Sequence, residues 1–82
     1  MTSVELSSRA AEWLDKAEPD VHEQIIDRLD QAVAFPDHFL HRLTGRPLYK
    51  LRAGDYRCII DWRQDEEVLF VREIGHRRNI YD

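Results

Sequence analysis

The chain has 82 residues, a formal net charge of −4 and a single cysteine, Cys58; its length suits one domain with a small core, which we assign to residues 1–82. One cysteine excludes an internal disulfide and a cysteine-rich metal site. No apolar run approaches the length that crosses a membrane, and the N-terminus has no signal-peptide pattern, so we expect a cytoplasmic protein with no membrane partner.

A short strand and a helical hairpin are predicted for the first part of the chain. Val4 and Leu6 alternate with polar neighbours, which is the period of a strand, and Ser7 or Ser8 can cap the helix that follows. Pro19 separates this helix from a second one. The apolar residues that recur at helical spacing are Ala10, Trp13, Leu14, Ala17, Val21, Ile25, Ile26, Leu29, Ala32 and Val33.

A loop is predicted after the second helix. The segment Phe35-Pro36-Asp37 stops the helix, and residues 37–47 are expected to be loop. Two histidines, His38 and His41, fall in this loop, and neither they nor His22 have a ligand partner at metal spacing. We therefore assign no metal site.

Two strands joined by a tight turn are predicted between Leu48 and Trp62. Gly54-Asp55 suits a two-residue hairpin turn, with the glycine at the position that needs a positive φ. In that register Ala53 lies opposite Tyr56, Arg52 opposite Arg57, and Lys50 opposite Ile59. Three cations then share one sheet face, and like charges placed opposite each other are destabilising unless a ligand of opposite charge compensates them. The pattern therefore favours an anionic ligand on this face.

The charges divide unevenly along the chain. Residues 1–40 carry three cations and nine acidic residues, a net charge of −6, whereas residues 41–82 carry nine cations and seven acidic residues, a net charge of +2. Overall acidity argues against a protein that binds nucleic acid through bulk electrostatics, but the division allows a local basic site on an acidic body.

A further long strand is predicted from Glu67 to Ile74, ended by Gly75. The order β-α-α-β-β-β predicts an α+β fold, in which the N-terminal strand and the helical hairpin pack on a small, mostly antiparallel sheet. The helices cover one face, and the opposite face carries the three cations. The residues assigned to the core on any interpretation are Trp13, Trp62 and Phe70, with Cys58 as a small core residue facing away from Arg57.

Three runs of sequence carry a resemblance to a known family. They are Leu43-Thr44-Gly45, the run YKLRAGDYR at 49–57, and the run IGHRRNIY at 74–81. Together, in this order and after a helical hairpin, they resemble the RelE/ParE superfamily of type II toxin–antitoxin toxins. The resemblance implies a compact toxin that a cognate antitoxin neutralises.

The resemblance also implies an activity. RelE-type members are endoribonucleases that cleave mRNA in the ribosomal A site without a metal or a small-molecule cofactor, with the ribosome and mRNA as partners. The RNA 2′-OH attacks the adjacent phosphorus, and basic residues hold the phosphate. Carried over by motif, the site residues of this chain are Lys50, Arg52, Arg57, Arg77 and Tyr81.

The residue types fit this chemistry. Attack by a 2′-OH needs a base, charge stabilisation at phosphorus and an acid for the leaving oxygen. Arg57 and Arg77 can supply paired N–H donors to the phosphate. Lys50 is one candidate for the base, and His76 is a candidate for acid or base, because imidazoles titrate near neutrality. Tyr81 offers a ring for base stacking, worth roughly 1–3 kcal/mol per base.

Structural roles remain open for the same residues. Arg52 and Arg57 could form a surface ladder with Asp55 or Asp61, and Lys50 could be solvated. His76 could be an ordinary turn residue, Arg78 a second phosphate contact or a solvated charge, and Tyr81 could pack over the sheet edge.

Two other functions also stay open. One is a ParE-like inhibitor that poisons DNA gyrase by binding it. The other is a catalytically degenerate module, kept for binding the antitoxin.

Overall fold

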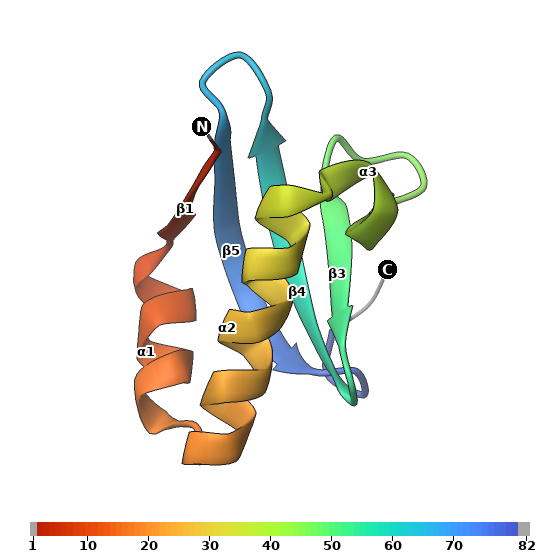
Figure 1. Cartoon of the computed structure of the whole chain (residues 1–82). Coiled ribbons are helices and arrows are strands. Elements are labelled where there is room, and N and C mark those ends of the chain that lie inside the picture. The colour runs from red at the N-terminus through yellow and green to blue at the C-terminus, as the bar shows by residue number, and fades with distance from the viewer. Residues whose placement is uncertain (1, 81–82) are drawn as a thin grey trace.

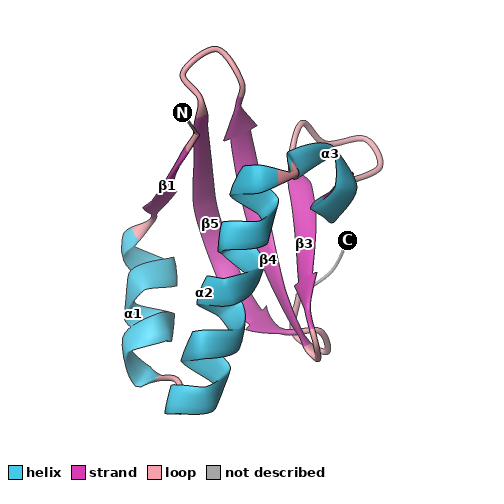
Figure 2. Cartoon of the chain, viewed as in Figure 1, coloured by secondary structure: helices cyan, strands magenta, loops and turns pink. Residues whose placement is uncertain are grey.

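The structure, a computed structural model, describes residues 2–80. Its elements are β1 (Ser3–Leu6), α1 (Ser8–Lys16), α2 (Pro19–Ala34), α3 (Pro36–Phe39), β2 (Leu40–Arg42), β3 (Tyr49–Ala53), β4 (Tyr56–Arg63) and β5 (Val68–His76). The strands form one sheet in the order β1-β5-β4-β3-β2, in which only β1 and β5 run parallel. Helices α1 and α2 lie side by side against one face of this sheet (Figures 1 and 2). The predicted α+β fold, with a mostly antiparallel sheet, is confirmed.

The segment expected to be loop at 37–47 is partly ordered. Its first residues form α3 and the short strand β2. Pro36 supplies a φ that suits the start of a helix, and β2 is held by pairing with β3, where Leu40 lies opposite Leu51. The prediction was wrong because a three-residue strand is too short to show a period, and it depends on partners seven to eleven residues further along the chain.

The last strand is longer than predicted, because β5 runs through Gly75 to His76. Gly75 lies opposite Arg57 in the ladder, and a Cβ built on it would lie 3.0 Å from Cδ1 of Ile80. The glycine therefore does not end the strand. It leaves room for the chain that follows to fold back and pack its Ile80 side chain on the sheet.

The main core lies between the helices and the sheet. Buried side chains of α1 and α2 meet the sheet residues that point toward them; among the fully buried are Ile25, Leu51, Cys58, Ile60, Leu69 and Val71. Trp13 and Trp62 pack against this core as predicted. Phe70 does not, because it alternates with Leu69 and Val71 and so points to the other face, where the Arg63 guanidinium lies 4.7 Å from its ring centre.

A second, smaller cluster lies on the sheet face away from the helices. It consists of Leu43, Leu48, Ile59 and Ile80, all buried. Ile59 is the strand residue of this cluster, while the others come from the loop before β3 and from the chain after β5. The face opposite the helices is therefore covered in part, and the predicted basic residues lie on the part that this cluster leaves open.

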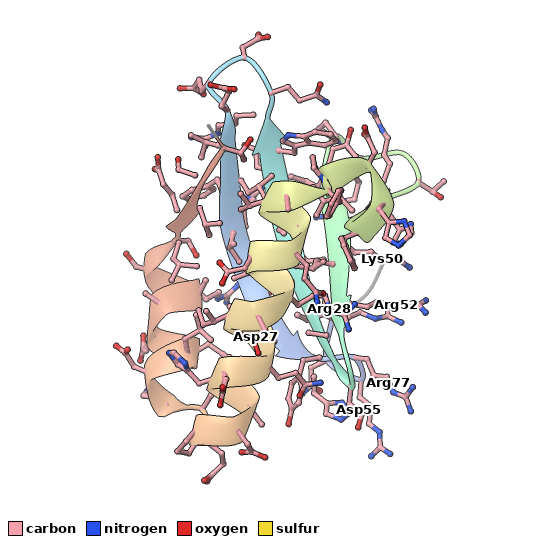
Figure 3. The ribbon with its side chains drawn as sticks, viewed as in Figure 1. Asp27, Arg28, Lys50, Arg52, Asp55 and Arg77 are labelled. Carbon is pink, nitrogen blue, oxygen red and sulfur yellow. The ribbon has the colours of Figure 1, made fainter. Side chains whose placement is uncertain are left out.

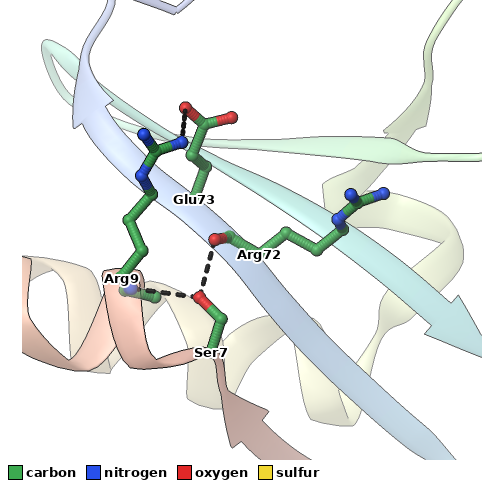
Figure 4. Close-up of polar contacts among 5 residues, drawn as sticks. Ser7, Arg9, Arg72 and Glu73 are labelled. Carbon is green, nitrogen blue, oxygen red and sulfur yellow. Dashed lines mark hydrogen bonds and ion pairs between the residues drawn. The ribbon is translucent and has the colours of Figure 1, made fainter.

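Helix α1 is joined to β5 by polar contacts at its start (Figure 4). The Ser7 hydroxyl accepts a hydrogen bond from the Ala10 N–H at 3.0 Å and donates one to the Arg72 carbonyl at 2.7 Å. Arg9 also forms an exposed ion pair with Glu73 at 3.2 Å. Because one hydroxyl both caps the helix and bonds the strand, Ser7 sets where the helical layer meets the sheet.

We expect Ser7→Ala to lower the free energy of unfolding by about 1–2 kcal/mol, the usual cost of losing a cap plus a hydrogen bond. Chemical denaturation measures this change. Ser8→Ala is the matched control, because Ser8 is exposed on the first turn, and it should change stability by less than about 0.5 kcal/mol. Equal effects of the two substitutions would contradict the assigned cap.

We expect Gly75→Ala to displace Ile80, because the new methyl group would lie 3.0 Å from Cδ1 and 3.2 Å from Cγ1 of that side chain. The loss should not exceed the roughly 1.5–3 kcal/mol gained by burying one isoleucine side chain. Ile80→Val removes Cδ1 and should recover part of the loss in the Gly75→Ala background. Denaturation of the two single variants and the double variant tests this, and additive losses would argue against a direct contact.

Candidate functional site

The hairpin of β3 and β4 has the predicted register. Ala53 lies opposite Tyr56, Arg52 opposite Arg57, and Lys50 opposite Ile59. The turn between the strands contains Gly54 at φ 61°, as the tight turn requires. Because Leu51, Ala53 and Cys58 are buried under the helices, the residues that alternate with them point to the opposite face. The predicted placement of Lys50, Arg52 and Arg57 away from the helices is confirmed.

The basic face, as we call it, comprises Lys50, Arg52, Arg57 and Arg77. Figure 3 shows the side chains of Lys50, Arg52 and Arg77 pointing to the same side of the molecule, away from α2. Arg52 is exposed, whereas Lys50 and Arg57 are partly buried. Arg52 and Arg57 are opposed like charges, an arrangement that a bound anion stabilises. Their planar guanidinium groups suit the oxygens of a phosphate.

Arg77 joins the basic face through the chain that follows β5. Its backbone N–H donates a hydrogen bond to the Asp55 carbonyl at 2.8 Å, which fixes this chain against the turn between β3 and β4. Its Nε lies 4.0 Å from Asp55 Oδ1, with the two side chains 58% and 67% exposed. A contact this long and exposed is weak, so it does not neutralise the charge of the Arg77 guanidinium.

An open depression of about 420 Å³ adjoins the basic face and is lined by His41, Arg42, Lys50 and Arg52. His41 lies directly opposite Lys50 in the β2–β3 ladder. Sequence reasoning missed both β2 residues as site candidates, because it treated them as loop. The one signal present was Leu40, an apolar residue beside two polar ones, and it becomes meaningful only once the pairing with Leu51 is known.

The carboxylates considered as partners of the arginine pair contact other arginines. Asp61 accepts a hydrogen bond from Arg63 Nε at 3.0 Å, and Asp55 lies beside Arg77. In a surface ladder, Arg52 and Arg57 would therefore have to compete with Arg63 for Asp61 and with Arg77 for Asp55.

His76 lies away from the basic face. It is opposite Tyr56, and the two rings are 5.6 Å apart between centres. The ring of Tyr56 in turn lies 5.6 Å from that of Trp13 in α1 between centres, which places these rings on the helix side of the sheet. The His76 Nδ1 accepts a hydrogen bond from the Arg78 N–H at 3.2 Å. The structure thus favours a structural role for His76 over the role of acid or base.

The remaining groups that could be reactive or bind a metal do not add to this site. Burial raises the pKa of the Cys58 thiol to about 12, so it stays neutral and is not a nucleophile near neutral pH. Within residues 2–80, no group of three or more His, Cys, Asp or Glu side chains is arranged to hold a metal ion. In the same residues, no helix is both long and apolar enough to span a membrane. Tyr81 lies outside the described residues.

Comparison with known proteins agrees on one family. The sequence model of the family described as the ParE toxin of type II toxin–antitoxin system, parDE, matches residues 4–81. No curated protein matches the sequence.

Solved structures of RelE toxins share the fold. A chain of the intact *E. coli* RelBE toxin–antitoxin complex superposes with a TM-score of 0.78 at 26% identity, covering 93% of this chain and 96% of that one. A chain of the *Mycobacterium tuberculosis* RelBE2 complex gives 0.81 at 16% identity, covering 93% and 98%. The archaeal RelE–RelB complex of *Pyrococcus horikoshii* gives 0.75 at 20% identity, covering 96% and 98%. With the family match over nearly its whole length and with this shared fold, the chain belongs to the RelE/ParE superfamily of toxins of type II toxin–antitoxin systems.

Proposed function

We propose that the protein is a ribosome-dependent mRNA endoribonuclease of the RelE type, which works without a metal ion. The observation that carries this proposal is the basic face, where Arg52 and Arg57 are held opposite each other beside a depression lined by cations. The similarity to the *E. coli* RelE toxin supports the same activity. A ribosomal target also fits the cytoplasmic location that we expect from the sequence.

In this reaction the 2′-oxygen of a nucleotide bonds to the adjacent phosphorus, and the bond from phosphorus to the 5′-oxygen breaks. Negative charge grows on the other phosphate oxygens as this happens. Arg52, Arg57 and Arg77 donate N–H groups to those oxygens, in positions fixed by the ladder and by the contact of Arg77 with the turn. Tyr81, by the resemblance, stacks on a base.

We further propose a cognate antitoxin as the protein partner, since the RelBE structures are complexes of a toxin with its antitoxin. Such a partner would place an amphipathic helix or an extended segment over the helical hairpin or over the basic face. Covering the basic face would block the phosphate site directly.

A ParE-like inhibitor of DNA gyrase is the second candidate, because the matching family model is that of ParE toxins. Induced expression followed by mapping of mRNA ends separates the candidates. Cuts in phase with codons support the nuclease. DNA-damage signalling with intact mRNA would support the gyrase inhibitor, and the absence of any growth defect would leave a degenerate antitoxin-binding module.

We expect Arg57→Ala to lower the rate of ribosome-dependent mRNA cleavage by about 100-fold or more, the usual cost of removing one donor to a developing anion. Its stability should change by less than about 1 kcal/mol, because the side chain lies outside both buried clusters. Cleavage of mRNA on purified ribosomes and denaturation measure the two quantities.

Arg63→Ala is the matched control for this variant. Arg63 lies on the same strand, about 20 Å along it from Arg57, and is paired with Asp61. It should cleave at the wild-type rate. Equal cleavage by wild type and Arg57→Ala would overturn the assignment of the site.

A further inference from the structure

The proposed reaction needs a group that takes or gives a proton near neutral pH. A guanidinium keeps its proton at that pH, so the arginines of the basic face can bind a phosphate but cannot act as a base. Imidazole is the side chain whose ordinary titration falls in this range. The chain has four histidines, all within the described residues, and the question is which of them reaches the phosphate site.

Three of the histidines lie elsewhere. His22 is exposed on α2, in the helical layer on the other side of the sheet. His38 belongs to α3, where its ring packs edge-on against Phe39 at 4.8 Å. His76 contacts Tyr56 edge-on, on the helix side. His41 is the histidine that lines the depression, together with Lys50 and Arg52.

The sheet register places His41 beside the phosphate-binding residues. Across β2, β3 and β4, one row of opposed residues is His41, Lys50 and Ile59, and the next row on the same face contains Arg52 and Arg57. The two rows are two residues apart along the strand, which is about 6.6 Å. Arginine side chains span this distance, so one phosphodiester linkage can contact both rows.

The orientation of His41 follows from its neighbour. Leu40 is buried, pairs with Leu51 and belongs to the main core, so the next residue along the strand points away from the helices. His41 is exposed, as a group that meets a substrate must be. The charged and titratable groups on its own strand and on the elements packed against it are Arg42, Tyr49, Lys50 and Arg52, with Asp37 and His38 of α3.

We propose that His41 is the catalytic base of the RNA cleavage inferred above, and that Lys50 is the acid; this assignment rests on the proposed function. The neutral imidazole takes the proton from the 2′-OH as the 2′-oxygen bonds to phosphorus. The bond to the 5′-oxygen breaks, and that oxygen takes a proton from the Lys50 ammonium group. The products are a 2′,3′-cyclic phosphate and a 5′-hydroxyl. Solvent then returns a proton to Lys50 and removes one from His41.

The pH dependence of single-turnover cleavage on mRNA-programmed ribosomes tests the base. The wild-type rate should rise with pH, because only a neutral imidazole can take the proton. His41→Gln should lose this rise and cleave about 10²–10⁴-fold more slowly. His38→Gln is the matched control, three residues away and outside the depression, and should keep both the rate and the profile.

A substrate with sulfur in place of the bridging 5′-oxygen separates base from acid, because a thiolate leaves without protonation. This linkage should restore Lys50→Ala toward the wild-type rate and leave His41→Gln slow. The reverse pattern, or a wild-type pH profile in His41→Gln, would overturn the assignment while leaving the nuclease in place. Absence of cleavage by the wild type itself would overturn both the assignment and the proposed function.

Discussion

The opposition of Arg52 and Arg57 across the β3–β4 ladder is the constraint around which the rest of the structure is arranged. Like charges placed directly opposite each other in a ladder are destabilising, and this pairing persists because the other side of the same strands is buried. Leu51, Ala53 and Cys58 form part of the core beneath the helices. A shift of the pairing register by one residue would bury the arginines and expose the core residues, so burial of the core itself holds the arginines at the surface.

The second cluster determines what else reaches that surface. Ile59 lies on the same face as the arginines and is covered by Leu43, Leu48 and Ile80. Packing of Ile80 beside Gly75 brings the chain after β5 back across the sheet, and the bond from Arg77 to the turn fixes its course. Packing of a few apolar side chains thus brings Arg77 to the side of the molecule that carries Arg52, 25 positions earlier in the sequence (Figure 3).

The two layers of the fold also separate the charges. The helices carry most of the acidic excess of residues 1–40, and the basic face lies on the other side of the sheet. An acidic protein can therefore carry a local basic site, whose attraction for an anion acts mainly at contact distance because long-range attraction is screened. The same separation gives a partner protein two chemically distinct faces to recognise.

The sequence by itself determined the α+β class, the helical hairpin, the hairpin register and the common face of Lys50, Arg52 and Arg57. These features follow from the spacing of residues within one helix, or within two strands joined by a two-residue turn. Only the tertiary structure decided that β2 joins the sheet, that His41 lies beside Lys50, that His76 faces the helices, and that Ile80 packs beside Gly75. Each of these depends on pairing or packing beyond a single helix or a two-residue hairpin, and such contacts produce no period in the sequence from which they could be read.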